Sequence, residues 1–278
     1  MLLLLQAVLT NFKFCGIINK KKGYSIMARN NEEEFLYNLM AKMYEVKAPV
    51  IFKGAMILKA VQNEYGNPTG LVRETHDIDG DWIGETPSME DLQSILQRAV
   101  DKIETTCTVT VKQVREYGEK QSAGFEFVEE DGNVLTTMDL SIKNNKYYKL
   151  YEIDGVYFLG QTIEKILVDK IYVCSTKKVY RRIKDVIDLY ILSYCWKGSY
   201  QSLLTLSKDA DREFEAFTHF TENFSGLEHA YSKYHNSASG GDFREVYKRV
   251  FAFLAPFIMH YDGKYYWDSS VWVFKEGV

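Results

Sequence analysis

The hydrophobic pattern of this chain changes its period once, near residue 160. Before that point apolar and polar residues alternate, as in β-strands, in four segments: 107–117, 123–130, 134–142 and 147–158. After it apolar residues recur at helical spacing in four more: 162–175, 179–195, 201–217 and 243–259. Strands in the first half and helices in the second predict an α+β domain followed by a mainly helical one.

Further elements are expected at both ends of the chain. Asn30 or Asn31 can cap a helix whose first turn is acidic, and Ser88 can cap another. Between them we expect a strand at 49–52, a helix that begins at 53–55, and a strand at 75–83. The aromatic segment 264–274 predicts a small hairpin, and residues 237–241 predict a loop.

Residues 1–26 stand apart from this pattern. The run Met1–Thr10 is apolar but too short to span a bilayer, and a basic run follows it rather than precedes it. It can be a poor signal peptide, a buried element, or an upstream extension of a gene that starts at Met27, and we favour the last. The expected organisation is an extension at 1–26, an α+β domain at 27–159 and a helical domain at 160–278.

The composition is that of an ordinary globular protein and excludes several other classes. Of 278 residues, 46% are hydrophobic and 26% are charged, which excludes a disordered or low-complexity chain. The net charge of −4 gives no global basic field for nucleic acid, so only a local basic patch could bind it. Four isolated cysteines argue against structural zinc and disulfides and favour the reducing cytoplasm. We expect no membrane partner, because no other segment approaches a transmembrane length.

Asp77 and Asp79 lie two residues apart on a predicted strand, so both carboxylates point to one face. From Glu74 to Asp91 the chain has seven acids and no Lys or Arg, and such a cluster needs either solvent or a cation. Carboxylates suit Mg²⁺, which proteins hold with one or two of them together with substrate phosphates. A solvated acidic turn is the alternative. A calcium loop is excluded, because Trp82 stands where that loop needs Gly.

Two more segments could complete such a site. The Gly54–Ala55 turn between a strand and a helix exposes backbone N–H groups at a helix N-terminus, which favours anions, although a plain tight turn has the same pattern. Asp139 lies on the polar face of the strand 134–142 with Thr137 and Ser141. It could be merely solvated or could join the Asp77–Asp79 pair around a metal.

Four motifs in this order resemble a known family. They are the run FKGA at 52–55, RETHDID at 73–79, QTIEKILVDK at 161–170 and RRIKDVIDLY at 181–190. Together they resemble the nucleotidyltransferase toxins of the AbiEii/AbiGii type, the toxin half of type IV toxin–antitoxin and abortive-infection systems. Ala55 stands where the family has a second Gly or Ser, and Lys184 precedes Asp185 where it usually has Arg.

The resemblance implies a polymerase-β-like nucleotidyltransferase domain with a mixed sheet, followed by the helical domain. It implies transfer of a nucleoside monophosphate from an NTP to an acceptor hydroxyl, with Mg²⁺ or Mn²⁺. Asp77, Asp79 and Asp139 are then the metal ligands and catalytic carboxylates. The residues that the resemblance implies for binding the NTP come from several segments: Gly54, Ala55, Arg73, Lys184 and Asp185.

Lys170 belongs to a basic stretch, residues 164–185, with seven Lys or Arg against three acids. This stretch is either a solvated helical face or a patch for phosphate or RNA. Lys170 lies within an apolar helical stripe, where a charge is costly to bury. We expect it to reach the NTP phosphates or the acidic cluster as a catalytic residue, so that its removal changes stability little. The alternative is an ammonium that extends out to water.

Three hypotheses about function follow. The first is a toxin that modifies RNA, most plausibly a tRNA end, with a cognate antitoxin as partner. The second keeps the chemistry and changes the acceptor to a protein or to a small molecule such as an antibiotic. The third is a catalytically silent module that binds a nucleotide or a partner. An intact set of Asp77, Asp79 and Asp139 argues against silence.

Overall fold

A seven-stranded mixed sheet organises the first half of the molecule. The computed structural model describes residues 24–71, 75–105, 107–118, 122–143, 145–234, 241–262 and 264–275. The order across the sheet is β3-β4-β5-β2-β1-β7-β6. The strands are β1 (Val50–Lys53), β2 (Asp77–Trp82), β3 (Val109–Arg115), β4 (Ala123–Glu129), β5 (Val134–Ile142), β6 (Tyr148–Ile153) and β7 (Val156–Gln161).

The central strands run in both directions. β2 is parallel to β5 and antiparallel to β1, and β1 is parallel to β7. Strands β3, β4 and β5 form an antiparallel meander at one edge, and the β6–β7 hairpin forms the other edge. This arrangement confirms the predicted α+β class with a mixed sheet.

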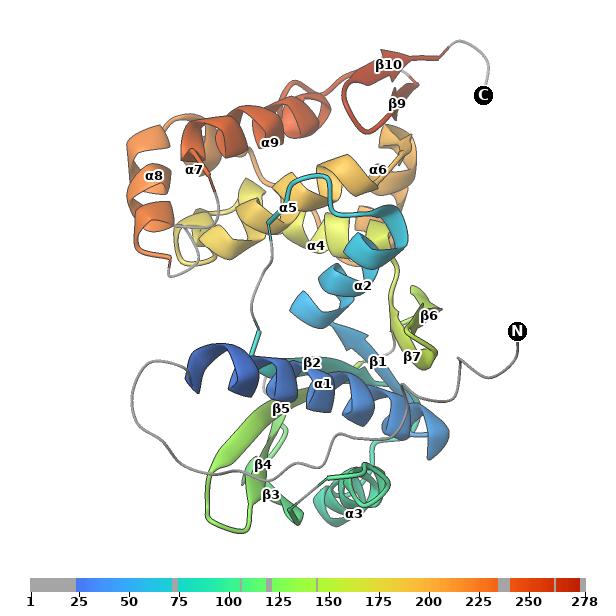
Figure 1. The fold of residues 1–278 in the computed structure, drawn as a ribbon. Helices are drawn as coiled ribbons and strands as arrows, with labels where there is room; N and C mark the ends of the chain where they lie inside the picture. Colours follow the sequence, from blue (N-terminus) through green and yellow to red (C-terminus); the bar gives the residue numbers. More distant parts are fainter. Residues whose placement is uncertain are drawn as a thin grey trace, which may run out of the picture.

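Helices α1 (Tyr24–Glu45) and α3 (Met89–Val100) cover one face of the sheet (Figure 1). Phe35 and Leu39 of α1 and Leu96 of α3 are buried, and so are Phe125 and Met138 of the sheet. Ser88 caps α3 as predicted, because its Oγ accepts a hydrogen bond from the Asp91 N–H at 3.1 Å. The opposite face of β2 and β5 carries the polar residues.

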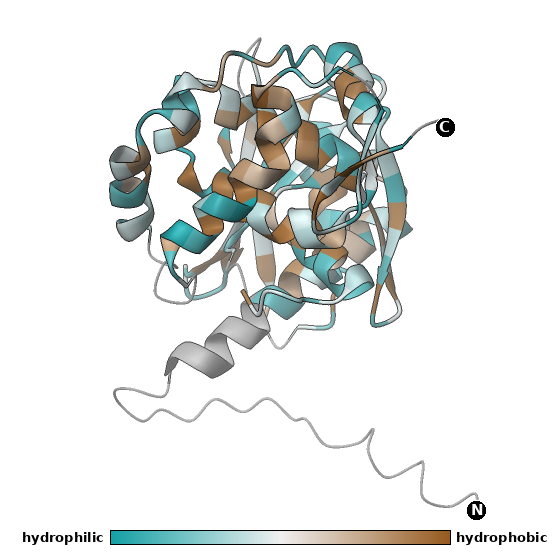
Figure 2. Ribbon diagram, turned by 90° about the horizontal axis from the view of Figure 1, so that it is seen from above, coloured by the Kyte–Doolittle hydropathy of each residue, from teal (hydrophilic) through white to brown (hydrophobic). Residues whose placement is uncertain are grey.

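The second half is mainly helical. It contains α4 (Ile163–Ser175), a 3₁₀ turn (Lys177–Tyr180), α5 (Ile183–Cys195), α6 (Tyr200–Asp209), α7 (Thr218–Thr221), α8 (Phe224–Ser232) and α9 (Phe243–Ile258). In Figure 1 these helices lie above the sheet, and α2 (Ala55–Tyr65) stands between the two halves. Figure 2 shows hydrophobic residues concentrated on the central helices of the view from above.

A hairpin closes the described chain. Its strands β9 (Tyr265–Trp267) and β10 (Trp272–Phe274) confirm the predicted hairpin, and β9 also pairs with β8 (Gly198–Ser199). Arg249 of α9 attaches it to α5: its guanidinium lies 3.9 Å from the ring centre of Tyr194 and donates to the carbonyl oxygen of Ser193 at 2.9 Å. The nearby ring of Trp267 adds a second cation–π contact at 4.9 Å.

Several predicted boundaries are wrong. Helix α1 begins at Tyr24, so Asn30 and Asn31 lie inside it and do not cap it. The single strand expected at 147–158 is two strands, because the chain turns at Asp154 and Gly155, both with positive φ. The helix expected at 201–217 ends at Asp209, before the left-handed residues Asp211 and Phe217.

Helices α7 and α8 were not predicted; four and nine residues are too few for a clear period. The loop expected at 237–241 lies largely outside the described residues, as does most of the 1–26 extension. Strand β7 continues to Gln161, so the sheet extends past the boundary expected at 159. Cys107, Cys174 and Cys195 are free thiols, as expected. In the described part of the chain, no helix combines the length and apolarity needed to cross a bilayer.

Candidate functional site

Five residues form one row across the open face of the sheet. Strand pairing places Lys53 opposite Asp79, Asp79 opposite Asp139, Asp139 opposite Gly124, and Gly124 opposite Arg115. Paired residues in adjacent strands point to the same side of a sheet. The row therefore carries charge in the order cation, anion, anion, gap, cation.

The three acids of β2 all lie on this face. Asp77, at the start of the strand, accepts a hydrogen bond from the Thr75 hydroxyl at 2.7 Å and is exposed. Asp81, at the other end, is buried and forms an ion pair with Lys53. Its second oxygen accepts a hydrogen bond from the Asn145 amide at 3.1 Å. Asp81 is thus satisfied within the protein, which leaves Asp77 and Asp79 as the carboxylates available to a ligand.

The surroundings of Asp79 disfavour the ionised form of its carboxyl group. Burial raises the pKa of its carboxyl above the ordinary value, and the neighbouring Asp77 and Asp139 raise it further. Lys53 and Lys184 oppose the shift but do not cancel it. A cation that binds beside Asp79 would therefore stabilise its ionised form.

The Gly54 turn brings the backbone close to Asp79. Gly54 has φ of 76°, and a Cβ atom at this position would lie 3.0 Å from Oδ2 of Asp79. Only glycine meets both conditions without strain. Ala55 follows at the first position of α2, and no side chain caps this helix N-terminus. The first-turn N–H groups therefore point out beside the Asp79 carboxylate.

Asp139 is paired with an arginine. Its Oδ1 forms an ion pair with Nη2 of Arg115 at 2.5 Å. Within the described residues, no three or more acidic, His or Cys side chains come together in a way that could hold a metal ion. The three predicted carboxylates thus share a face without forming a closed cluster.

Lys170 and Asp185 form a buried ion pair with each other. Lys170 Nζ is bonded to Asp185 and lies 2.7 Å from Oδ2 of Asp188, and Arg182 also pairs with Asp185 at 2.7 Å. Asp185 and Asp188 are 0% and 1% exposed. The alternative in which the Lys170 ammonium reaches water is therefore wrong. Asp185 and Asp188 both belong to α5, so this lysine joins α4 to α5.

Lys184 and Arg73 are the other two side chains predicted to bind the NTP. The positive charge of Lys184, at the N-terminal end of α5, acts to lower the pKa of Asp79. Arg73 lies outside the described residues.

A polar cavity of about 360 Å³ adjoins the row at Lys53. Its sheet side is formed by Lys53, Asp81 and Gln161, and its helix side by Lys165 and the loop that follows α6. Charges of both signs line it: Lys53, Lys143, Lys146, Lys165 and Arg212 face Asp81, Asp169, Asp209 and Asp211. Its volume lies within the range of small-ligand pockets, about 300–1,000 Å³.

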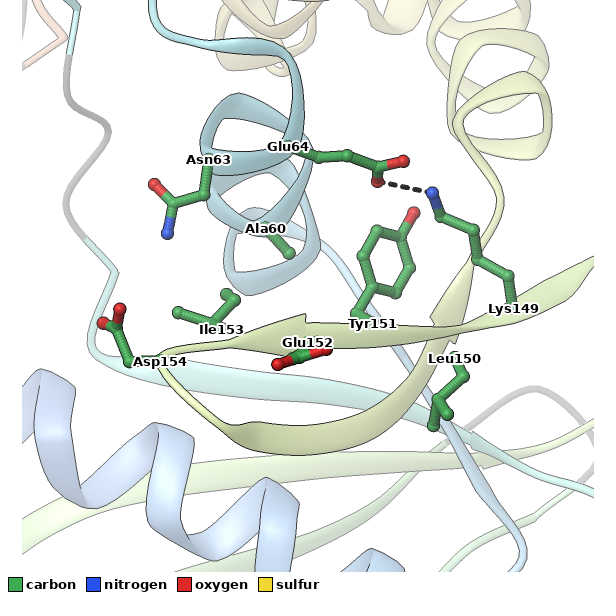
Figure 3. A pocket seen from close by; sticks show the side chains of 9 residues that line it. All are labelled: Ala60, Asn63, Glu64, Lys149, Leu150, Tyr151, Glu152, Ile153 and Asp154. Carbon is green, nitrogen blue, oxygen red and sulfur yellow. Dashed lines mark hydrogen bonds and ion pairs between the residues drawn. The ribbon is translucent and has the colours of Figure 1, made fainter.

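A second hollow, of about 710 Å³, lies between α2 and β6 (Figure 3). Glu64 of α2 and Lys149 of β6 form an ion pair across it, and the Lys149 ammonium lies 4.5 Å from the ring centre of Tyr151. None of the predicted site residues lines this groove. It is separate from the row on the sheet.

The residues present fit a divalent metal. Asp77 and Asp79 supply hard oxygen ligands on one face, and the missing Cβ of Gly54 leaves room beside Asp79. Two carboxylates with substrate phosphates are the usual set for Mg²⁺. Asp139 could join that set after leaving Arg115.

Sequence reasoning missed Lys53, Asp81 and Arg115 as parts of the site. Lys53 and Asp81 lie inside the motifs already singled out, and their pairing follows from the antiparallel register of β1 and β2. Arg115 had no such signal. Alternation from Val109 and Val111 puts it on the covered face, but a bulge between Gln113 and Arg115 turns it to the open one.

Comparisons with known proteins place the fold. No family model matches the chain, and no curated protein matches its sequence. JHP933 from Helicobacter pylori shares the fold with a TM-score of 0.53 and 15% identity, over 85% of this chain and 94% of that one. MenT4, a nucleotidyltransferase toxin from Mycobacterium tuberculosis, shares it with a TM-score of 0.51 and 12% identity, over 84% and 85%. The chain therefore has the α+β nucleotidyltransferase fold, with a mixed sheet and a mainly helical C-terminal half.

Proposed function

We propose that this protein is a metal-dependent nucleotidyltransferase that moves a nucleoside monophosphate from an NTP to an acceptor hydroxyl. The observation that carries the proposal is the pairing of Asp79 with Asp139 on adjacent strands, with Asp77 and the Gly54 turn beside them. On a nucleotidyltransferase fold, this is the arrangement that phosphoryl transfer needs: carboxylates for the metal and backbone N–H groups for the phosphates.

The chain's residues divide the chemistry between them. Asp77 and Asp79 would hold Mg²⁺ or Mn²⁺, which supplies charge neutralisation at the attacking and leaving oxygens. The N–H groups of Ala55 and the next residues, together with Lys184, bind the triphosphate. The acceptor oxygen forms a bond to the α-phosphorus, its proton passes to the Asp139 carboxylate, and the bond to pyrophosphate breaks.

The cavity beside Lys53 gives the NTP an orientation. It lies on the β1–β7 side of Asp79, whereas Asp139 lies on the β5 side. With its phosphates at Gly54, the nucleoside enters this cavity. The acceptor then approaches from the opposite side, over β5 and β3.

We further propose that the acceptor is RNA, in particular a tRNA end, and that the protein acts in the cytoplasm as an AbiEii/AbiGii-type toxin with a cognate antitoxin. The four sequence motifs and the fold shared with a nucleotidyltransferase toxin support this. Transfer to a protein or to a small molecule would use the same carboxylates. The experiment below distinguishes these acceptors from RNA.

The decisive experiment follows the α-phosphate. The protein is incubated with Mg²⁺, total cellular RNA and protein, and each NTP labelled at the α-phosphorus. We expect label in RNA, and a loss of at least about 100-fold in Asp77→Asn, because even indirect partners of metal ligands typically contribute 10–100-fold. Glu90→Gln, an exposed acid of the same stretch, is the matched control. Absence of label from every fraction of the wild type would overturn the proposal.

A further inference from the structure

Arg115 is held in place at the far end of the row. Its Nε donates to the carbonyl oxygen of Ser122 at 2.7 Å, and its Nη2 donates to the Ser122 hydroxyl at 2.7 Å. The same Nη2 contacts Asp139. Three contacts on one guanidinium fix the direction of a side chain that is 42% exposed.

Gly124 makes this geometry accessible. It lies between Arg115 and Asp139 in the register, and a Cβ atom there would lie 3.3 Å from Cβ and 3.5 Å from Cζ of Arg115. The guanidinium therefore passes over a position without a side chain. The bulge in β3 and the absence of a side chain at Gly124 together allow the Arg115 guanidinium to extend along the row toward Asp139.

The Asp139 carboxylate has two competing uses. In the structure its Oδ1 is occupied by Arg115, and the described residues contain no closed metal cluster. The proposed reaction needs the same carboxylate for a metal ion or for the acceptor proton. When Asp139 turns to that task, Arg115 loses its anion and presents N–H donors to whatever lies over β5 and β3.

We propose that Arg115 is an acceptor-binding residue that exchanges Asp139 for a phosphate group of the RNA acceptor, next to the attacking hydroxyl. This rests on the proposed function. A guanidinium matches the oxygens of a phosphodiester in a two-pronged contact, and contacts of this kind position nucleic acids without reading sequence. The side of the sheet is also the right one, because Lys53, Gly54 and the cavity take the NTP on the other side of Asp79.

The first test measures binding rather than activity. The probe is a fluorescein-labelled single-stranded RNA with a free 3′ end, followed by anisotropy in Mg²⁺. We expect Arg115→Met to raise Kd about 10-fold and to reduce the dependence of log Kd on log salt by about 0.7, the value for one phosphate contact on a single strand. Arg98→Met, an exposed arginine of α3 on the covered side of the sheet, should leave both unchanged.

The second test examines the competition between Asp139 and the RNA phosphate for Arg115. In EDTA, Asp139→Asn removes the competing anion while keeping the side-chain shape, so it should tighten RNA binding. The same change in an Arg115→Met background should have no effect. Circular dichroism melts confirm that each variant is folded. If Asp139→Asn does not tighten binding, or if Arg115→Met binds RNA as Arg98→Met does, the inference is wrong.

The third test separates the inference from the proposed function. With a dinucleoside monophosphate as acceptor, Arg115→Met should raise the KM for the acceptor and leave the KM for the NTP unchanged. With a nucleoside, which has no phosphate, the variant and the wild type should be equal. Label that enters a protein acceptor equally in both proteins would overturn the role of Arg115 while leaving nucleotidyl transfer by the Asp pair intact.

Discussion

Asp79 combines three unfavourable conditions: it is largely withdrawn from water, two acids lie close to it, and the backbone of Gly54 approaches its carboxylate. Ionisation of such a group is unfavourable in the metal-free protein, and a bound cation removes much of this free-energy cost. Sites of this kind trade stability of the metal-free protein for affinity toward a ligand.

Replacement of Asp79 should therefore separate stability from activity. Because its pKa is raised in the folded state, ionisation of Asp79 as pH rises through that range costs stability, and a neutral Asn avoids the cost. We expect Asp79→Asn to melt no lower than the wild type at pH 7 in EDTA, and to lose at least about 100-fold in transfer. Thermal melts and label transfer measure the two effects; a variant with normal transfer would remove Asp79 from the site.

Gly54 gives the converse result. Gly54→Ala places a Cβ atom against Oδ2 of Asp79 and forces an L-residue to a φ of 76°. This backbone conformation alone, with ψ of −148°, costs an L-residue about 1–3 kcal/mol, so we expect a lower melting temperature as well as lost transfer. Gly66→Ala is the control, since Gly66 has a φ of 80° but nothing within 4 Å of the added Cβ. If both variants behaved alike, the approach to Asp79 would not matter.

At the scale of elements, helices α4 and α5 are joined by buried charge. Lys170 lies within the apolar stripe of α4 as predicted, and Asp185 and Asp188 of α5 neutralise it. The helical period could place the lysine in the interior, because that depends only on spacing within one helix. Its partners could not be predicted, because they depend on how two helices pack.

These partners reverse the expectation that Lys170 can be removed without loss of stability. Breaking one side of a buried ion pair leaves an uncompensated charge and costs about 3–5 kcal/mol. We expect Lys170→Met to lower the melting temperature by about 6 °C or more. Lys177→Met, an exposed lysine just beyond α4, should melt as the wild type does. An unchanged melting temperature for Lys170→Met would contradict the structural role.

Asp169 predicts how this region responds to acid. Burial raises the pKa of its carboxyl, but ion pairs with Lys165 and Arg212 outweigh that and lower it below the ordinary value. A lowered folded-state pKa adds stability above the unfolded pKa of about 3.9, and this is lost as pH falls through the folded value. Asp169→Asn should therefore cost about 1–2 kcal/mol at pH 7. Urea titrations at several pH values should show the difference shrink as pH falls below about 4; a constant difference would contradict the account.

At the scale of the molecule, the site draws on both halves of the chain. Lys53, Gly54, Asp77 and Asp79 come from the sheet domain, and Lys184 comes from the first turn of α5. The sequence placed the acids and the turn correctly, since each lies within one short motif. It could not place Arg115, because a single bulged residue in β3 decides which face that side chain occupies.

A ligand that touches both halves should stabilise the whole protein. With Mg²⁺ and a preferred NTP at 100 times Kd, binding adds about 2.7 kcal/mol, or about 5–10 °C in melting temperature. We expect Lys184→Met to reduce that shift while leaving the melting temperature of the free protein unchanged. Lys177→Met again serves as the control, and differential scanning fluorimetry is sufficient. A full shift in the Lys184 variant would remove this residue from the nucleotide site.

The Lys170–Asp185–Asp188 cluster also limits how this protein can evolve. Replacement of Lys170 leaves Asp185 and Asp188 without their shared lysine, whereas a joint replacement of all three by apolar residues of similar volume can be neutral or better. In a complete library of variants, single changes here should be depleted and particular double or triple changes should survive. We therefore expect these three positions to change together rather than one at a time.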